Sequence, residues 1–265
     1  MVRMITGKTR LLGVIGSPIG HSLSPMIQNA ALRAAGLDYV YVALPASPYA
    51  LDSVVYGLRD AGVVGFNVTI PFKTEMIHLM NDLSDDARHV QAVNTVVIQR
   101  DSRLVGHNTD VMGFLAGFAE RDVVLAGKSA VMIGAGGAAR AALWGLLQSH
   151  VSSVVIGVRN PAKGAALCKD FAANGDVRAL SFDDPAFISA MGAADIVVQT
   201  TPLGMMPHVE EMPPVDITAM KPSAVVYDLI YTPAETRFLR EAAARGHVTI
   251  NGETMLVAQG AEAFF

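Results

Sequence analysis

The chain has 265 residues, enough for one large domain or two ordinary ones, and 51% of them are apolar while 17% are charged. The net charge of −4 and the absence of a Lys/Arg-rich run argue against a nucleic-acid-binding protein, and glycine and Arg140 interrupt the most apolar window too often for a membrane-spanning helix. A single cysteine, Cys168, excludes an intrachain disulfide and favours a reducing, cytoplasmic setting.

The first part of the chain alternates apolar and amphipathic segments. A helix is predicted to begin at Ser24-Pro25, with the serine as N-cap and the proline at the first helical position, and to end at Gly36. A second helix is predicted at 50–62, closed by Gly62. Strands are predicted at 10–16, 39–44 and 65–70, and as a pair at 93–100 and 103–108 around Asp101-Ser102.

From residue 110 the alternation restarts with a helix and continues to residue 252. Strands are predicted within SAVMI, VSSVVIGVR, ADIVVQTTP, AVVYDLIY and HVTING, with helices between most of them. Regular alternation of strand and helix is typical of parallel sheets covered by helices on both faces. We therefore predict a two-domain α/β protein whose boundary lies near residues 106–113.

A glycine-rich turn at the start of the second series predicts a nucleotide site. VMIGAGGAARAAL places Gly134-x-Gly136-x-x-Ala139 directly after a strand and at the start of a helix. In the dinucleotide fingerprint, the first glycine permits the tight turn and the second lets pyrophosphate approach the backbone. The helix N-terminus supplies amide donors for the phosphate. The alternative is a tight turn with no ligand.

The end of the next strand favours NADP over NAD. An NAD site usually has an acidic residue there, about 20 residues on, which binds the ribose hydroxyls. The segment VRNPAK has no acid and instead offers Arg159 and Lys163, cations suited to a 2′-phosphate. The alternative is an exposed basic helix start.

Polar residues in the first series suggest a substrate site. Ser22 and Ser24 are two residues apart, so an extended backbone points both hydroxyls the same way, beside a helix N-terminus, where they could hold a carboxylate. The alternative is that Ser24 only caps the helix and Ser22 is a loop residue. In GFNVTIPFK, Pro71 ends an apolar strand and Lys73 follows it.

Further candidates lie between this strand and the boundary. Asn94 enters an apolar strand, and Asp110 opens a helix, although Asn108, Thr109 and Asp110 are each suitable N-caps as well. All of these positions lie at strand ends or at the boundary, where α/β proteins bind ligands.

Taken together, these motifs resemble the shikimate dehydrogenase family, which includes shikimate and quinate dehydrogenases. The matching stretches occur in the family's order and cover most of the chain: GSPIGHSLSPMIQN, NVTIPFK, AVNT, GHNTDVMGF, GAGGAARAAL, TTPLGMMP, YDLIYTPAETRFL and NGETMLVAQGAEAF. No single stretch is decisive, but their order is specific.

The resemblance implies reversible, NADP-dependent reduction of 3-dehydroshikimate to shikimate, in the pathway to chorismate and the aromatic amino acids. It implies an N-terminal α/β substrate domain with a mainly parallel sheet, residues 1–109 with 252–265, and a Rossmann-type NADP domain, residues 110–251. The expected partners are small molecules, with no nucleic acid, membrane or metal, and the protein is expected to be a monomer or a homodimer.

Residue roles follow from the resemblance by position. Lys73 and Asp110 correspond to the family's catalytic pair. The substrate-binding positions are Ser22, Ser24, Thr69, Asn94, Tyr231 and Gln259. The cofactor-binding positions are Gly134, Ala135, Gly136, Gly137, Ala138, Arg159, Lys163, Leu229 and Gly252.

Departures from the family pattern leave two alternatives open. Gln28 replaces a histidine usual in the family, and Val158 and Asn160 replace the outer residues of its Asn-Arg-Thr segment. The altered segment keeps open a quinate/shikimate dehydrogenase paralogue that uses NAD or NADP. A catalytically silent binding or regulatory relative is the second alternative. The seven histidines have no metal-ligand spacing.

Overall fold

The structure is a computed structural model that describes residues 4–265, so the first three residues of the predicted 1–109 domain lie outside the described part. The chain divides into two compact units, Met1–Thr109 with Gly260–Phe265, and Asp110–Gln259. Residues 252–259, which we predicted to belong to the first domain, fall in the second unit in this division. The functional assignment of the two domains stays a prediction.

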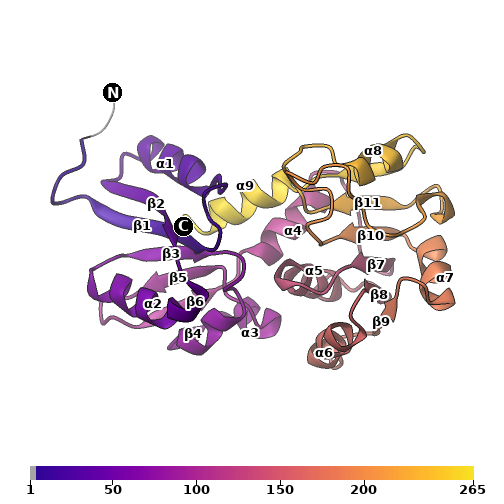
Figure 1. Ribbon diagram of the computed structural model, residues 1–265, viewed down its shortest axis with the longest axis horizontal. Helices are drawn as coiled ribbons and strands as arrows, with labels where there is room; N and C mark the ends of the chain where they lie inside the picture. Colours follow the sequence, from indigo (N-terminus) through magenta and orange to yellow (C-terminus); the bar gives the residue numbers. More distant parts are fainter. Residues whose placement is uncertain (1–3) are drawn as a thin grey trace. The chain divides into compact units, whose positions relative to one another are not determined.

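The first unit is built on a mixed sheet. Within the described residues it has six strands in the order β2-β1-β3-β5-β6-β4 (Figure 1). The pairs β1–β2, β1–β3 and β4–β6 are parallel, and β3–β5 and β5–β6 are antiparallel. The strands are β1 (Arg10–Gly16), β2 (Tyr39–Pro45), β3 (Gly65–Val68), β4 (Asp82–Leu83), β5 (Thr95–Ile98) and β6 (Leu104–His107).

The strand pair predicted around Asp101-Ser102 is confirmed. It is the antiparallel β5–β6 pair, in which Val96 lies opposite Gly106. Ser102 has a φ of 66°, the left-handed conformation that such a tight connection needs. This pair carries the chain from Asn94 back to Thr109, which brings the two ends together.

The first-unit helices are α1 (Ser24–Ala34), α2 (Leu51–Asp60) and α3 (Asp85–Val90), with short 3₁₀ turns η1 (Pro48–Ala50) and η2 (Glu75–Leu79). The predicted N-cap at Ser24 is wrong. The cap position is Leu23, whose φ of −84° and ψ of −10° are already helical, so Ser24 becomes the first helical residue. The predicted stops are confirmed: Gly36 and Gly62, with φ of 68° and 77°, each follow the C-cap residue of α1 and α2.

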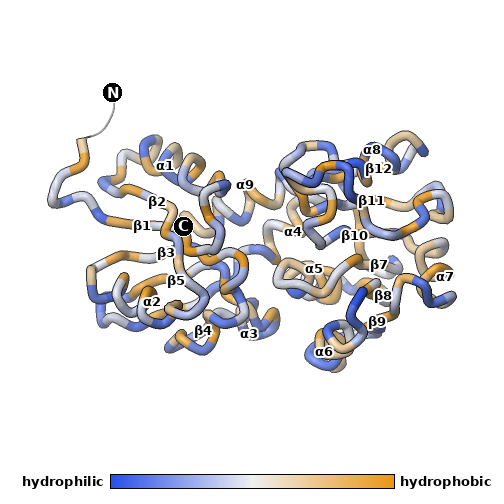
Figure 2. The backbone as a smooth tube through the Cα atoms, in the orientation of Figure 1, coloured by the Kyte–Doolittle hydropathy of each residue, from blue (hydrophilic) through white to orange (hydrophobic). Residues whose placement is uncertain are grey.

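Two apolar clusters cover the two faces of the first sheet. On one face, the buried side chains of Val55, Phe66, Phe72 and Met76 pack with others from α2, β3 and the segment after it. On the other face, Val14, Leu32 and Tyr41 pack together, with Phe264 against them. The apolar stretch of β1 can be followed in Figure 2. The buried Phe72 therefore fixes the backbone next to Lys73 in the first core.

The second unit has a fully parallel sheet. Its six strands within the described chain run in the order β12-β11-β10-β7-β8-β9. This is the 3-2-1-4-5-6 order of a Rossmann fold, and its topological switch point lies between β7 and β10. The strands are β7 (Ser129–Ile133), β8 (Ser153–Val158), β9 (Val177–Ser181), β10 (Ile196–Gln199), β11 (Val225–Asp228) and β12 (Val248–Ile250).

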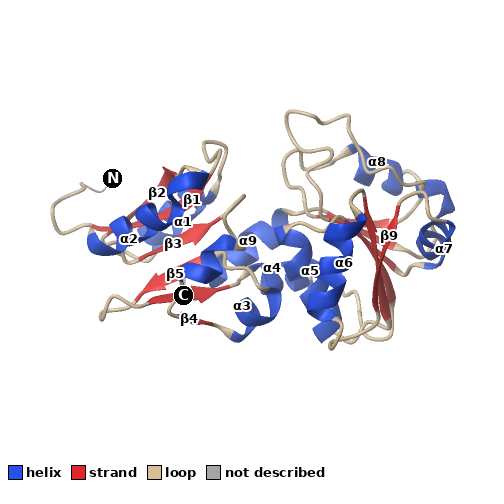
Figure 3. Ribbon diagram, turned by 60° about the horizontal axis from the view of Figure 1, so that its bottom comes forward, coloured by secondary structure: helices blue, strands red, loops and turns tan. Residues whose placement is uncertain are grey.

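Helices cover both faces of this second sheet (Figure 3). Phe114 of α4, Leu143 of α5 and Leu167 of α6 belong to one buried cluster, whereas Phe187 of α7 and Leu239 of α8 belong to the other. The helices are α4 (Asp110–Ala119), α5 (Gly137–Gln148), α6 (Pro161–Phe171), α7 (Pro185–Ala193) and α8 (Arg237–Ala243), with a 3₁₀ turn η3 (Ile217–Ala219). The last helix, α9 (Glu253–Glu262), begins in the second unit, and its residues from Gly260 on are assigned to the first. Within residues 4–265, the helices all fall short of the length and hydrophobicity needed to cross a membrane.

Candidate functional site

The glycine-rich turn joins β7 to α5 at the switch point of the second sheet. Gly134 has a φ of 106°, and a Cβ there would lie 2.7 Å from Thr201 Cγ2 and 2.8 Å from Thr200 Oγ1. Gly136 is the N-cap of α5, and a Cβ there would meet no atom within 4 Å. Gly134 is thus required by the fold itself, while Gly136 leaves open space at the N-terminus of a helix.

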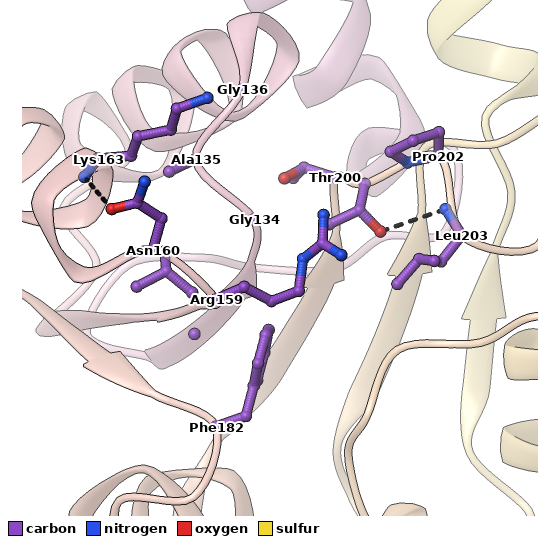
Figure 4. Close-up of a pocket in the computed structure, with 13 residues that line it drawn as sticks. Gly134, Ala135, Gly136, Arg159, Asn160, Lys163, Phe182, Thr200, Pro202 and Leu203 are labelled. Carbon is purple, nitrogen blue, oxygen red and sulfur yellow. Dashed lines mark hydrogen bonds between the residues drawn. The ribbon is translucent and has the colours of Figure 1, made fainter.

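A cavity of about 650 Å³ lies beside this turn. Figure 4 shows Arg159 extending into it above the ring of Phe182, with Lys163 on the side of the glycine-rich turn. The carboxyl ends of three neighbouring strands, β7, β8 and β10, supply most of the lining. The lining residues are Gly134, Ala135, Gly136, Gly157, Val158, Arg159, Asn160, Lys163, Phe182, Thr200, Thr201, Pro202 and Leu203.

The cavity collects some of the predicted cofactor residues but not all. Gly134, Ala135, Gly136, Arg159 and Lys163 line it. The predicted Gly137 and Ala138 form the first turn of the helix that follows.

Leu229 and Gly252 are not among the lining residues and instead lie against each other elsewhere in the second unit. A Cβ at Gly252 would be 2.1 Å from the Leu229 carbonyl oxygen, and the Gly252 amide donates to the Ile230 carbonyl at 2.9 Å. Only glycine fits this approach of two backbones, so Gly252 has a structural reason that is independent of any ligand.

Part of the lining was not predicted. Thr200 to Leu203 follow β10, and Thr200 Oγ1 donates to the Ile133 carbonyl at 2.7 Å, which ties this loop to the end of β7. The TTP sequence was visible as a strand end, but only the strand order shows that it lies next to the glycine-rich turn. Phe182, which follows the unpredicted edge strand β9, has no local signal for this role.

The polar groups of the cavity fit a phosphorylated dinucleotide. Arg159 and Lys163 are exposed and cationic, and the lining contains no carboxylate that could bind a ribose diol. Asn160 Oδ1 accepts from the amides of Ala162 at 3.0 Å and Lys163 at 3.4 Å, so it caps α6 between the two cations. The site can therefore hold a 2′-phosphate by charge-assisted hydrogen bonds. Within residues 4–265, groups of three or more His, Cys, Asp or Glu side chains suited to a metal do not occur.

In the first unit, the two predicted carboxylate-binding serines are in contact at the start of α1. Ser22 Oγ accepts from the Ser24 amide at 3.3 Å, and both residues are half-buried. Tyr41, on β2, is 4% exposed, and its hydroxyl donates to Asn67 Oδ1 at 2.6 Å. Burial raises the pKa of Tyr41.

Asn94 directly precedes β5 and lies beside the carboxyl end of β3, where its carbonyl accepts from the Val68 amide at 2.8 Å. It is 2% exposed, its Nδ2 donates to Thr109 Oγ1 at 2.9 Å, and its Oδ1 accepts from the Thr109 amide at 2.9 Å. Thr95 Oγ1 donates to the same Oδ1 at 3.0 Å. Asn94 therefore fixes the backbone of the residue that directly precedes Asp110.

Thr69 and Lys73 lie in the turn after β3. The Thr69 amide donates to the Ile15 carbonyl at 2.9 Å, and the Lys73 carbonyl accepts from the Val93 amide at 2.8 Å. Lys73 itself is half-buried, whereas the preceding Phe72 is 0% exposed. The turn is thus anchored on both sides, and the lysine stands on a rigid backbone.

Asp110, Tyr231 and Gln259 belong to the second unit. Asp110 is the first residue of α4 and is buried, a position where the helix dipole favours a carboxylate. Tyr231 is half-buried, and burial raises its pKa. Gln259 donates to the Leu256 carbonyl at 2.9 Å within α9. The predicted catalytic pair therefore has one member in each unit.

A buried carboxylate holds the loop that carries Tyr231. Asp228 Oδ1 accepts from the Ile230 amide at 3.0 Å, and Oδ2 accepts from Thr236 Oγ1 at 2.7 Å. Thr236 also caps α8, since its Oγ1 accepts from the Leu239 amide at 3.2 Å. Burial raises the pKa of Asp228 to about 7, against the effect of these hydrogen bonds. Sequence reasoning gave Asp228 no role.

Comparison with known proteins adds the following. Residues 14–96 match the model of the shikimate dehydrogenase substrate binding domain. The chain is 46% identical over 260 residues to a shikimate dehydrogenase (NADP(+)) of Geobacter metallireducens, covering 97% of this chain and 90% of the relative.

Two solved structures are similar over nearly the whole chain. One is shikimate 5-dehydrogenase from Listeria monocytogenes in complex with shikimate and NAD, with a TM-score of 0.91, 33% identity, and 100% of this chain and 93% of that one covered. The other is quinate dehydrogenase from Corynebacterium glutamicum in complex with NAD, with a TM-score of 0.88, 30% identity, and 97% and 92% covered.

Proposed function

Because the chain belongs to the shikimate dehydrogenase family, we propose that it reduces 3-dehydroshikimate reversibly to shikimate with NADPH, on the route to the aromatic amino acids. The observation that carries the proposal is 46% identity to an NADP(+)-dependent shikimate dehydrogenase over 97% of this chain. The cavity with Arg159 and Lys163 and no lining carboxylate supports the phosphorylated cofactor.

The reaction assigns a clear task to Lys73. Reduction of a ketone needs a hydride at carbon and a proton at oxygen, and NADPH, when bound, supplies the hydride. The Lys73 ammonium donates the proton and stabilises the negative charge that develops on the oxygen. In the reverse direction, the amine accepts the proton of the substrate hydroxyl. The anchored turn of Lys73 supports this role because a general acid must be held still.

Asp110 is the proposed partner of Lys73. A carboxylate orients the amine and accepts a hydrogen bond from it, and it can share in the movement of the proton. The anchoring of Thr109 by Asn94 supports this assignment, because it fixes the chain immediately before the carboxylate.

The other proposed contacts are divided between the substrate and the cofactor. Ser22 and Ser24 bind the substrate carboxylate, and Thr69, Asn94, Tyr231 and Gln259 contact its hydroxyls or the carboxylate. Gly134 to Ala138 bind the pyrophosphate, Arg159 and Lys163 bind the 2′-phosphate, and Leu229 and Gly252 border the nicotinamide. The single cysteine supports a cytoplasmic location, and a monomer or a homodimer stays the prediction for assembly.

Initial rates with shikimate or quinate, each with NADP or NAD, test the proposal directly. We expect the highest kcat/KM for shikimate with NADP. A higher value for quinate, or for NAD, would instead assign the chain to the quinate/shikimate dehydrogenase paralogues. Tight binding of shikimate and NADPH without any turnover would identify a catalytically silent relative.

A further inference from the structure

Two adjacent threonines follow β10 and line the nucleotide cavity. Thr200 and Thr201 are both half-buried, and neither has a role among the proposed contacts. Each hydroxyl could meet a bound dinucleotide, because the cavity lies at the carboxyl end of β10. The hydrogen bonds around them show that only one of the two keeps a proton for a ligand.

The Thr200 hydroxyl is used by the protein itself. Its Oγ1 donates its single proton to the Ile133 carbonyl at 2.7 Å, and the Thr200 amide donates to the same carbonyl at 3.0 Å. Both bonds hold the end of β10 against the end of β7. A phosphate oxygen accepts hydrogen bonds, so Thr200 could bind one only by giving up the bond from its hydroxyl to Ile133.

The Thr201 hydroxyl is in the opposite state. Its Oγ1 accepts from the Leu203 amide at 3.3 Å, a bond drawn in Figure 4, and among the hydrogen bonds of residues 4–265 it acts only as an acceptor. A hydroxyl that accepts through a lone pair still has its proton to donate. Thr201 also lies next to the glycine-rich turn, since a Cβ at Gly134 would be 2.7 Å from Thr201 Cγ2. The nearest part of a dinucleotide is therefore the pyrophosphate that we assign to this turn.

The side chain of Gln199 holds Thr201 in this place. Gln199 is the last residue of β10 and is 0% exposed. Its Nε2 donates to the carbonyls of Thr201 at 3.0 Å and Leu203 at 3.1 Å, and its Oε1 accepts from the Thr201 amide at 2.6 Å. Both protons of the amide nitrogen and one oxygen lone pair thus bind the backbone of a single loop. An ionised glutamate would have the same shape but no proton for the two carbonyls.

We infer that Thr201 binds the dinucleotide by donating its hydroxyl proton to a pyrophosphate oxygen, and that Gln199 is the positioning residue for this contact. The inference rests on the proposed function, because it concerns how the NADPH of that reaction is bound. It adds two residues that are not among the predicted site residues. It also separates Thr201 from Thr200, which has the same side chain and lines the same cavity.

Dissociation constants for NADPH, measured without substrate, test the inference. Thr201→Val keeps the shape and removes a hydrogen bond to a charged group, so we expect the constant to rise about 10- to 100-fold. Thr201→Ser keeps the hydroxyl and should stay within about threefold of the wild type. Thr200→Val should also stay within about threefold, but its midpoint in urea should fall, because it loses the bond to Ile133.

Shortened ligands locate the contact. Adenosine 2′-phosphate 5′-diphosphate ends at the pyrophosphate, whereas adenosine 2′-phosphate lacks it, and displacement of NADPH measures the affinity of each. Thr201→Val should weaken the binding of the first ligand as strongly as that of NADPH and leave the binding of the second unchanged. Unchanged binding of the first ligand would overturn the assignment to the pyrophosphate.

Gln199→Glu tests the positioning role in a double-mutant cycle. The carboxylate repels the two carbonyls and displaces the loop, so NADPH affinity should fall, and Thr201→Val should then add less than about threefold. An undiminished effect of Thr201→Val in this background would contradict the positioning role. Thr218→Val is the matched control in the second unit: its hydroxyl is exposed and donates to Asp216 at 2.6 Å, and NADPH binding should stay unchanged.

Wild-type affinity of Thr201→Val for NADPH would overturn the inference, and so would a loss in Thr200→Val as large as that in Thr201→Val. If Gln199→Glu does not fold, Gln199→Met, which keeps the length without a charge, takes its place in the cycle. Failure of the proposed function looks different: the wild-type protein then does not oxidise shikimate with NADP, whatever its affinity for NADPH.

Discussion

The nucleotide cavity and the proposed substrate residues are built in different ways. In the second unit, a single strand–turn–helix segment provides the phosphate-binding turn, and its key property is backbone conformation at Gly134 and open space at Gly136. In the first unit, side chains from distant segments converge, and hydrogen bonds such as those of Asn67 with Tyr41 and Thr95 hold them. We therefore expect substitutions to impair the two regions through different steps of the reaction.

The largest effect should come from the first unit, where side chains form the proposed substrate site. Lys73→Ala should lower kcat by about 10²–10⁴, the span for loss of a general acid–base, with little change in KM for either substrate. Steady-state rates with shikimate and NADP measure this. Lys8→Ala, at an exposed lysine of the same unit, is the control and should behave as wild type. A raised KM with normal kcat would mean that Lys73 only binds.

Two glycine variants probe the glycine-rich turn of the second unit, where backbone conformation is the key property. Gly136→Ala has room for its methyl group but places it where pyrophosphate would approach, so NADPH affinity should fall about 10- to 100-fold without loss of stability. Gly134→Ala has a φ of 106° and clashes with Thr200 and Thr201, so it should destabilise the second unit by about 1–3 kcal/mol.

The single tryptophan, Trp144, lies in α5 of the second unit, so its fluorescence during urea unfolding reports this unit alone. NADPH titrations of the same samples give the affinities. Equal effects of the two glycine variants on both stability and affinity would contradict the distinction between a glycine required by the fold and one required by the ligand.

In the second unit, Asp228 is an exception, because its side chain holds a loop in place. Its raised pKa predicts that the stability of the protein depends on pH. Its pKa is raised to about 7 from 3.8, so the unfolded chain ionises first and stability is lost as pH rises through this range. Between pH 5.5 and 8 the loss from this group should be on the order of 2 kcal/mol, and Asp228→Asn should remove it.

Asp195→Asn provides the control for this experiment. The hydrogen bond from Lys221 lowers the pKa of Asp195 to about 2, so its stabilising effect is lost only as pH falls below about 4, outside the window. Urea unfolding of the three proteins, followed by Trp144 fluorescence at both pH values, makes the comparison. If the free energy of unfolding of Asp228→Asn changed with pH as much as that of the wild type, the Asp228 carboxyl would ionise normally in the folded state.

The smallest expected effect compares two buried tyrosines. Within residues 4–265, the Tyr227 hydroxyl in the second unit has no hydrogen-bond partner, so Tyr227→Phe should stabilise the protein by about 1 kcal/mol. The Tyr41 hydroxyl in the first unit donates to Asn67 Oδ1, and Tyr41→Phe should destabilise by a similar amount. Thermal unfolding of both variants tests this, and the same sign for both would remove the contrast between the units.

Local patterns predicted most of the elements. The strand at 10–16, the stops at Gly36 and Gly62 and the β5–β6 pair are all present, because each depends on the few residues around it. The N-cap at Ser24 was wrong by one residue, since Leu23 already has helical dihedrals. The edge strand β9 was missed because the segment VRALS is short and only half-buried.

The site could be predicted only in part, because local patterns show only residues that are close in the sequence. Gly134, Gly136, Arg159 and Lys163 stand in one βαβ segment whose spacing is visible in the sequence. The approach of Thr200 to Ile133 and of Tyr41 to Asn67 depends on strand order and register, which bring together residues that are 67 and 26 positions apart. No local pattern encodes such contacts: the TTPLGMMP stretch marked Thr200 only as a strand end, and Phe182 and Tyr41 had no signal.

The most direct test measures the NADPH dissociation constant and the kcat of Lys73→Ala and Gly136→Ala side by side. The account predicts that Lys73→Ala binds NADPH like the wild type but turns over about 10²–10⁴ times more slowly, while Gly136→Ala binds NADPH weakly and recovers near-normal kcat at saturation. Weak NADPH binding by Lys73→Ala, or a low kcat of Gly136→Ala at saturating cofactor, would contradict it.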